Sequence, residues 1–565
     1  MKKLFGTVFI LILLFSLIAC SSSNENNDQI DNEVLDKTDD EMFTDRDLNE
    51  EAETEETERE DPQDKLIVFS KEEISTQGSG ISLDGNIVTV SEDGIYKLSG
   101  ESSDARIVVN APENAKIQLV LNGLTLESKE QAPIYIKACN KVFITVEEES
   151  TLVNGGTYTQ IDENNIDGVI FSKEDLTING KGILNIEANK GNGIVCKDDL
   201  VVTNLTMNIN CENHGLDANN SVRIKDASIK INSQNDGIHS EHGEDESLGY
   251  IYISYGNIEI SSMGDGFDAS STVQIVDGNI KISTTQNQNG NSNKGVKAEG
   301  TVQIEKGTIS ISSIDDSIHS NNTVNIFGGI ITIETGDDGI HADETLVVNN
   351  GEINILKSYE GLEAHTININ GGKITLKSSD DGINAAGGSD QSGTGGNFGG
   401  DNFQRPGTRP GGMGGMGGMG SSSSDGSITI SGGEIYINAS GDGIDANGTI
   451  LIEGGYTVVC GPTQGDTAVL DYDVSGTITG GTFIGTGSYM MAQTLKGEGQ
   501  GVYSVSVGNQ QAGTKITLTD KNGQVMFDYT PALNFAIVIL TSEQVIKGES
   551  YTIAVGNQSG TFEAQ

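Results

Sequence analysis

Residues 338–385 read "DGIHADETLVVNNGEINILKSYEGLEAHTININGGKITLKSSDDGINA", and this stretch decides the fold because it repeats itself. An acidic residue, a glycine and an apolar residue occur together three times within it, 22 and 21 residues apart. Related motifs run from Gly193 to Gly443, some with another residue in place of the acid or, at Ser317, in place of the glycine. Their spacings are mostly 22 residues, with two of 29 and a last one of 61. A period of this length indicates a solenoid in which each repeat is one supersecondary unit that stacks on its neighbours.

Inside each repeat, apolar and polar residues alternate around a glycine corner. Examples are "TLVVNNGEINILK" (345–357) and "TININGGKITLK" (366–377). Alternation of this kind predicts short strands, and glycine supplies the positive φ that the corner needs. Three strands and three corners in about 22 residues describe one coil. We therefore predict an all-β, right-handed parallel β-helix of the pectate-lyase-like type, followed by a small C-terminal β segment.

The composition divides the chain into further parts. Residues 65–497 carry the β-helix pattern, which a flexible Gly/Met/Ser-rich loop interrupts at residues 387–426. Residues 498–565 have more aromatic residues and a different pattern. We expect them to form a C-terminal β cap, because an uncovered end of a β-helix exposes a strand edge that invites aggregation.

The N-terminus is typical of a bacterial lipoprotein. Residues 1–20 contain two lysines, an apolar run and the ending "LIAC", which predict a signal peptide and lipidation of Cys20. The lipid would anchor the chain at the extracellular face of the cell membrane. Residues 21–64 hold 19 acidic residues against three basic ones, so we expect a disordered acidic tether.

The rest of the chain is also strongly acidic. Residues 65–565 contain 63 Asp and Glu against 28 Lys and Arg, a net charge of −35. A field of this sign repels nucleic acid and anionic membrane surfaces, so neither is an expected partner. Divalent cations are better candidates.

Stacked coils would align acidic residues in a column before the repeat glycines. Equivalent residues lie roughly 4.8 Å apart, and two carboxylates at that distance repel by about 3.5 kcal/mol at an effective dielectric near 20. Ca²⁺ accepts irregular sets of oxygen ligands, so we predict bound Ca²⁺; the alternative is a solvated acidic ridge with raised pKa values. The predicted metal ligands are Asp236, Asp265, Asp315, Asp316, Asp337, Asp338, Glu360, Asp380, Asp381 and Asp442.

A second polar column lies two residues after each glycine. We expect it to face outward, where it could bind sugar hydroxyls; two histidines on neighbouring coils also leave a transition metal open. The predicted ligand-binding residues are Asp217, His239, Asp268, His319, His341, Glu363 and Asp445.

Four segments carry a resemblance to a known family: "GIYKLSG" (94–100), "IQLVLNGLTL" (117–126), "PIYIKACNKVFITV" (133–146) and "GVIFSKEDLTINGKGILNI" (168–186). With the repeated glycine motif, they resemble bacterial cell-surface proteins that have a calcium-containing, pectate-lyase-like β-helix and bind cellulose and acidic sugars. The resemblance implies carbohydrate binding and bound calcium for this chain.

Three functions follow as hypotheses. The leading one is a monomeric, lipid-anchored, calcium-stabilised and non-catalytic protein that binds polysaccharide, above all polysaccharide with uronate groups. The second is a calcium-dependent polysaccharide lyase, in which Lys294 or Lys297 would be the base that removes a proton. Neighbouring carboxylates would keep these lysines protonated, which argues against that role. The third is a structural spacer on the cell surface.

Overall fold

The computed structural model describes residues 37–48, 65–71, 73–285, 292–385, 425–462 and 467–565. The predicted signal peptide with Cys20, most of the predicted tether and nearly all of the loop at 387–426 lie outside these residues. No helix among the described residues is long and apolar enough to cross a membrane.

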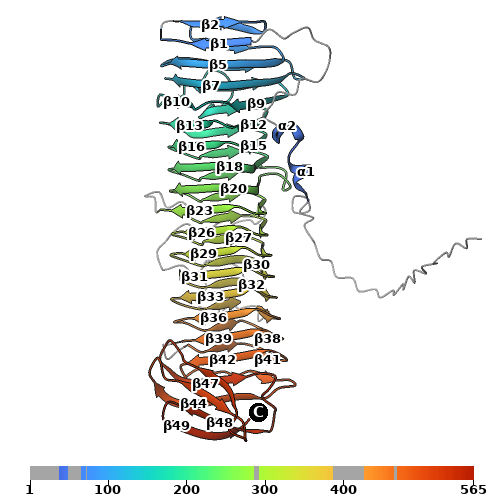
Figure 1. Cartoon of the computed structure of the whole chain (residues 1–565), viewed down its shortest axis with the longest axis vertical. Helices are drawn as coiled ribbons and strands as arrows, with labels where there is room; N and C mark the ends of the chain where they lie inside the picture. The colour runs from blue at the N-terminus through green and yellow to red at the C-terminus, as the bar shows by residue number, and fades with distance from the viewer. Residues whose placement is uncertain (1–36, 49–64, 72, 286–291, 386–424, 463–466) are drawn as a thin grey trace, which may run out of the picture.

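The prediction of an all-β fold is confirmed. Apart from two four-residue helices, every regular element among the described residues is a strand, and the strands stack along one long axis (Figure 1). From β8 onward most strands pair in parallel with the strand one repeat later, so that Ile318 lies opposite Ile340 and Ile340 opposite Leu362. Each repeat therefore forms one layer of the stack, and each layer adds one strand to each of three columns of paired strands.

The first column follows the repeat glycines. Its strands are β6 (Arg106–Asn110), β8 (Ile134–Ala138), β11 (Gly168–Ser172), β14 (Asn192–Cys196), β17 (Leu216–Ala218), β19 (Ile238–Ser240), β21 (Phe267–Ala269), β24 (Val296–Ala298), β27 (Ile318–Ser320), β34 (Ile383–Ala385), β37 (Ile444–Ala446) and β40 (Leu470–Tyr472). Two longer strands, β30 (Ile340–Val348) and β32 (Leu362–Ile369), run from the first column into the second.

The second column comprises β9 (Lys141–Val146), β12 (Asp175–Gly180), β15 (Asp199–Thr203), β22 (Thr272–Ile275), β25 (Thr301–Ile304), β28 (Thr323–Ile326), β35 (Ser427–Ile430), β38 (Thr449–Ile452), β41 (Ser475–Ile478) and β43 (Lys496–Gly497). Three long strands, β7 (Lys116–Ser128), β18 (Ser221–Ser233) and β20 (Tyr250–Ser262), run from the second column into the third.

The third column comprises β10 (Ser150–Asn154), β13 (Ile183–Ala188), β16 (Thr206–Cys211), β23 (Asn279–Thr284), β26 (Thr308–Ser312), β29 (Ile330–Glu334), β31 (Glu352–Ser358), β33 (Lys373–Ser378), β36 (Glu434–Asn438), β39 (Tyr456–Cys460) and β42 (Thr482–Gly487).

Both ends of the stack add antiparallel strands. At the N-terminal end, β1 (Lys65–Phe69) pairs with β2 (Ile74–Gln77), and β3 (Ile81–Asp84) with β4 (Ile87–Val90). The strand β5 (Gly94–Ser102) joins β1 to β7, and β4 pairs in parallel with β6. At the C-terminal end, β47 (Phe535–Thr541) lies antiparallel between β42 and β44 (Val502–Gln510). A separate four-stranded sheet contains β45 (Ile516–Thr519), β46 (Val525–Tyr529), β48 (Ser550–Val555) and β49 (Gln558–Glu563).

Repeated aliphatic side chains fill the interior between the columns. Ile318, Ile340 and Leu362 are fully buried and occupy the same position in three successive layers. Burying one such side chain is worth about 1.5–3 kcal/mol, and the gain recurs in every layer.

The glycines in the repeat have two different roles. Gly351 and Gly372, at the Asn-Gly and Gly-Gly corners, have φ of 110° and 86°, as the sequence predicts. Gly339, after the two aspartates, is required for space instead. A Cβ there would lie 2.5 Å from the carbonyl oxygen of Gly361 in the next layer and 2.7 Å from Cδ1 of Ile355.

Residues 37–48 differ from the expected disordered tether. They form α1 (Asp39–Met42) and α2 (Asp45–Leu48), which lie beside β12, β15 and β18 (Figure 1). Met42 and Phe43 are buried against Tyr250 and Tyr252. The count of acidic residues missed this contact because only a few of them, spaced along the segment, meet basic partners on the strands.

Candidate functional site

The strand register aligns the two polar columns as the sequence predicts. In the second polar column, Asp217 lies opposite His239, and His319 lies opposite His341. The register also adds Asp471 of β40 opposite Asp445, a position that the sequence analysis missed. The segment "AVLDY" (468–472) has valine in place of the repeat glycine, which hid this last layer.

The carboxylates before the glycines support the layers directly. Oδ1 of Asp316 accepts a hydrogen bond of 3.1 Å from the backbone N–H of Asp338, and Oδ1 of Asp338 accepts one of 3.0 Å from the N–H of Glu360. Asp236 and Asp265 accept equivalent bonds from the next layer. The column is therefore largely buried and hydrogen-bonded, and the solvated ridge considered as an alternative does not describe it.

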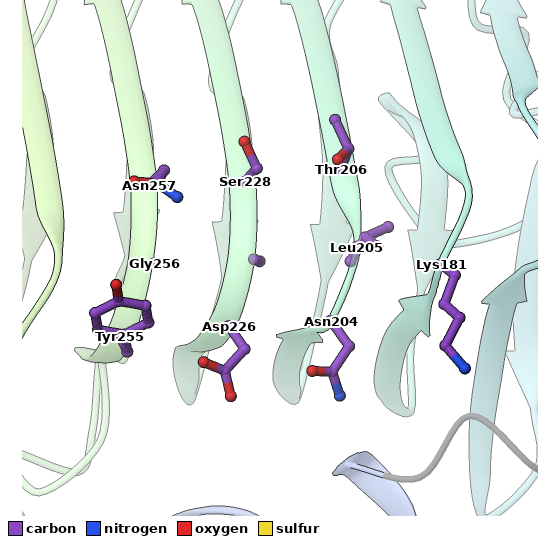
Figure 2. A pocket seen from close by; sticks show the side chains of 10 residues that line it. Lys181, Asn204, Leu205, Thr206, Asp226, Ser228, Tyr255, Gly256 and Asn257 are labelled. Carbon is purple, nitrogen blue, oxygen red and sulfur yellow. The ribbon is translucent and has the colours of Figure 1, made fainter.

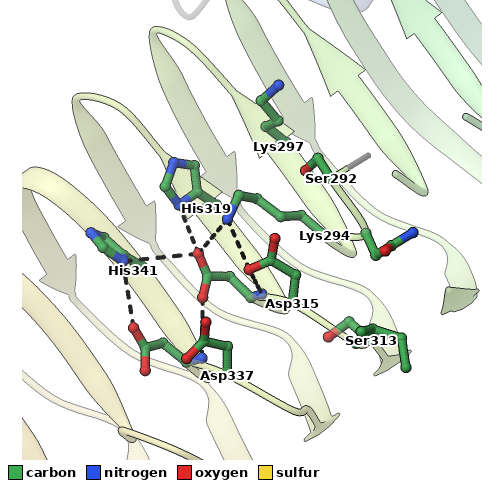
Figure 3. Close-up of polar contacts among 12 residues, drawn as sticks. Ser292, Lys294, Lys297, Ser313, Asp315, His319, Asp337 and His341 are labelled. Carbon is green, nitrogen blue, oxygen red and sulfur yellow. Dashed lines mark hydrogen bonds and ion pairs between the residues drawn. The ribbon is translucent and has the colours of Figure 1, made fainter. Parts of the chain in front are cut away.

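In the middle of this column, Lys294 provides the positive charge. Its Nζ lies 3.1 Å from Oδ1 of Asp315 and 2.8 Å from Oδ2 of Asp316, and Nδ1 of His319 lies 2.9 Å from the same Oδ2 (Figure 3). Burial alone would raise the pKa of Asp316, but Lys294, His319 and His341 hold it well below its ordinary value. The ammonium of Lys294 therefore supplies positive charge beside Asp315 and Asp316, two of the predicted calcium ligands.

Lys297 lies in the same layer as Lys294, in the second polar column, and its ammonium contacts carboxylates of the preceding layer. Its Nζ lies 3.5 Å from Oδ1 of Asp268 and 4.0 Å from Oδ2 of Asp265. Burial, followed by the charges of Asp268 and Asp236, raises the pKa of Asp265 well above its ordinary value. Lys297 therefore balances part of the negative charge of these carboxylates.

Histidines balance the layers before that. Nδ1 of His214 lies 3.0 Å from Oδ2 of Asp236, and Nδ1 of His239 lies 2.8 Å from Oδ1 of Asp217. Burial would lower the pKa of His239, but Asp217 and the nearby carboxylates raise it to about 9. His239 therefore carries a positive charge at neutral pH.

The second polar column was expected to face outward and bind sugar hydroxyls, and this expectation is wrong for part of the column. His319, His341 and Glu363 are buried. The reason is that each histidine lies three residues after an acidic residue at the same corner and contacts it, at 2.9 Å for Asp316 and 3.5 Å for Asp338. The two polar columns form one internal network.

One group within this network has the form of a metal site. Oδ2 of Asp338, Nδ1 of His341 and Oε2 of Glu363 converge within 4.8 Å of one another. None of these three atoms makes a hydrogen bond within the described residues. Burial, and then Asp338, raises the pKa of Glu363 to about 10. A donor set with one imidazole fits a transition metal better than calcium, which favours oxygen ligands.

A second acidic group, with oxygen donors alone, lies further along the stack. Burial and neighbouring carboxylates raise the pKa of Asp381 to about 8 and that of Asp445 to about 7. Oδ1 of Asp381 accepts the N–H of Asp442, and Oδ1 of Asp442 accepts the N–H of Ala468. No lysine or arginine in the described part of the chain forms an ion pair with Asp381 or Asp445. These oxygen donors fit calcium.

The remaining predicted metal ligands lie close to these two groups. Burial, and then Asp338, raises the pKa of Glu360 to about 9, and its Oε2 accepts a 2.7 Å hydrogen bond from Asn384. Asp337 and Asp380 are partly exposed. Asp337 belongs with Asp315 and Asp316 to a further acidic group.

The family follows from comparison with known proteins. A family model described as "Carbohydrate-binding domain-containing protein" matches residues 84–339 and 337–382, which together cover more than half of the chain. The chain belongs to this family.

Two similar proteins accompany the family match. A carbohydrate-binding domain-containing protein of Acetivibrio thermocellus is 32% identical over 142 residues, which span 24% of this chain and half of the relative's length. The solved structure of the polysaccharide lyase-like protein from C. thermocellum, a gadolinium derivative, is 31% identical, with coverage of 43% of this chain and 97% of that one and a TM-score of 0.40.

Proposed function

We propose that this chain is a non-catalytic polysaccharide-binding protein, held by lipid on Cys20 at the extracellular face of the bacterial membrane. Its fold would be a right-handed parallel β-helix of the pectate-lyase-like type, and it would act as a monomer. Membership of the carbohydrate-binding family supports the partner class. The parallel pairing of strands one repeat apart supports the β-helix.

The acidic stretch at Asp381, Asp442 and Asp445 carries the proposal of bound calcium. These carboxylates are crowded together, and burial with the charges of neighbouring carboxylates raises the pKa values of Asp381 and Asp445. Because one oxygen of Asp381 already accepts a backbone N–H group, its second oxygen would be held in place for a cation. Calcium, when bound, would offset the repulsion and offer open coordination positions to a uronate carboxylate.

The negative charge of the protein also determines how it would bind acidic sugars. The protein repels a polyanion everywhere that its own carboxylates are ionised. At the acidic columns, a uronate chain would therefore be bound only where a cation covers them. This mechanism makes the binding of acidic polysaccharide depend on calcium.

The geometry of the lysines argues against the lyase. The Lys294 side chain is 4% exposed and its ammonium contacts two carboxylates, so a substrate proton could not reach it in this arrangement. Lys297 is paired with Asp268. Neither side chain is placed to remove a proton from a sugar.

Calorimetric titration of the metal-free protein with calcium tests the proposed site. We expect binding that Asp381→Asn weakens at least tenfold, because it removes a charged oxygen donor. Glu434→Gln, which removes one exposed carboxylate from β36, is the matched control and should leave calcium binding unchanged. Equal calcium binding by the two variants would refute this site.

A further inference from the structure

The segment at residues 37–48 covers one face of the second column of strands. Met42, Phe43 and Asp47 are buried, although the segment is strongly acidic. Its contacts extend from β9 through β12, β15 and β18 to β20, which are five successive layers and a length of roughly 19 Å. We call this surface the covered face; it comprises Lys141, Phe143, Thr177, Arg223, Lys225, Tyr252 and Ser254.

One end of the covered face binds the carboxylate of Asp39. Lys225 Nζ and the Ser254 hydroxyl each contact Oδ2 at 2.8 Å, and the Tyr252 hydroxyl donates to Oδ1 at 2.8 Å. Arg223 donates to the carbonyl of Met42 at 2.7 Å. Three donors on one carboxylate make a specific site for that group, since charge-assisted hydrogen bonds are about twice as strong as neutral ones.

The other end binds the carboxylate of Asp47. Lys141 Nζ and the Thr177 hydroxyl contact Oδ1 at 2.7 and 2.5 Å. Thr203 donates to the backbone carbonyl of Asp47 at 2.6 Å. The covered face therefore holds two carboxylates, several layers apart, from one continuous segment that contains α1 and α2.

The covered face is unusual for this protein in both charge and composition. Three basic side chains meet on it in a chain whose net charge is −49. Cζ of the Arg46 guanidinium lies 4.2 Å from the centroid of the Phe143 ring, and Tyr252 packs against Phe43. Basic groups beside aromatic rings are suited to a ligand that has both carboxylates and flat apolar faces, as a uronate chain has.

An open groove continues from the covered face. A pocket of about 240 Å³ lies at the adjoining corner, where Asn204, Asp226 and Tyr255 of successive layers are aligned (Figure 2). Asn204 Nδ2 donates to the carbonyl of Leu48, the last residue of α2, at 2.9 Å. The Tyr255 ring is half exposed. A longer ligand could thus extend from the covered face into this groove.

We propose that the covered face is a binding site for a carboxylate-bearing polysaccharide chain, and that residues 39–48 occupy it as an intramolecular competitor. Asp39 and Asp47 take the positions of two ligand carboxylates. The ligand binds when this segment leaves, so its apparent affinity is reduced by the fraction of molecules in which the face is open. The ligand class rests on the proposed function, but the site is separate from the acidic columns and needs no calcium.

Titration of the full-length protein with a galacturonate oligosaccharide in EDTA tests this proposal. The variant Asp39→Asn/Asp47→Asn should bind at least tenfold more tightly than the wild type, because it weakens the competitor. The control Asp40→Asn/Asp45→Asn makes the same change of charge at two exposed residues of the same segment and should show no gain. Adding Lys225→Ala to the first variant should abolish the gain.

Hydrogen exchange provides a second measurement on the wild-type protein. The oligosaccharide should accelerate exchange of the backbone amides in residues 39–48, and a neutral glucan oligosaccharide should not. Failure of the first variant to gain affinity, or an equal gain in the control, would overturn the proposal. Loss of calcium-dependent binding by the wild type would instead count against the proposed function alone.

Discussion

Replacement of Lys294 by methionine should destabilise the middle of the stack. The methionine keeps most of the apolar length of the side chain and removes the charge that lies between Asp315 and Asp316. The Asp316 carboxylate is fully buried and 2.8 Å from the lysine Nζ, whereas the Asp315 side chain is 29% exposed. Most of the loss should therefore come from Asp316.

Removal of one partner from a buried ion pair typically costs about 3–5 kcal/mol, since the other charge is left uncompensated. His319, 2.9 Å from Asp316, remains as a partial partner, so we expect a value near the lower end of this range. At 1.36 kcal/mol for each factor of ten, hydrogen-exchange protection in this layer should fall about a hundredfold. Added calcium should restore part of it, because oxygens of Asp315, Asp316 and Asp337 lie within 4.8 Å of one another.

Hydrogen exchange resolved by residue is the suitable assay, because repeat proteins open locally as well as globally. The informative amides are those of Gly295 and Ser317, which bond to Asp316 and Asp338 across adjacent layers. Lys306→Met, at an exposed lysine in the next corner, is the control. Equal protection in the two variants would refute the reasoning that Lys294 neutralises the column.

Three further predictions concern cations, pH and packing. Calcium at a hundred times its dissociation constant should stabilise the protein by about 2.7 kcal/mol, so chelation should lower the melting temperature. Asp381→Asn should lessen this effect of chelation, and an unchanged melting curve of the wild type in EDTA would contradict the prediction. Burial would raise the pKa values of Asp39 and Asp47, but Lys225 and Lys141 with neighbouring hydroxyls lower both. The docking of α1 and α2 is thus fully stabilised above the ordinary pKa of 3.8 and weakens as the pH falls below it, which amide exchange at pH 6 and pH 3 would measure. Gly339→Ala should cost about 1–3 kcal/mol by overpacking, whereas Gly243→Ala, with open space around its Cβ, should cost little in thermal melts.

The repeat period was sufficient to predict the strand register. Because each layer buries the same aliphatic positions, a shift of one residue would turn Ile340 and its equivalents away from the interior. The aligned columns before and after the glycines followed from that register. The layer that contains Asp471 was not predicted from the sequence, because Val469 stands where other repeats have glycine.

The charge balance within the columns could not be read from the sequence. Spacing places Lys294 in line with the acids, but only the path of its side chain shows that it contacts Asp315 and Asp316 rather than solvent. The burial of His341 depends in the same way on the acidic side chain at its corner. The docking of Asp39 on Lys225 joins residues 186 positions apart, which local patterns do not report.

The most direct test of the central claim is a glycan array probed with the full-length protein in calcium and in EDTA. We expect binding to uronate-containing polysaccharides in calcium, and loss of most of that binding in EDTA. Absence of binding to any glycan in calcium would contradict the proposed function and leave a structural spacer, and equal binding of acidic glycans in both conditions would contradict the role of calcium.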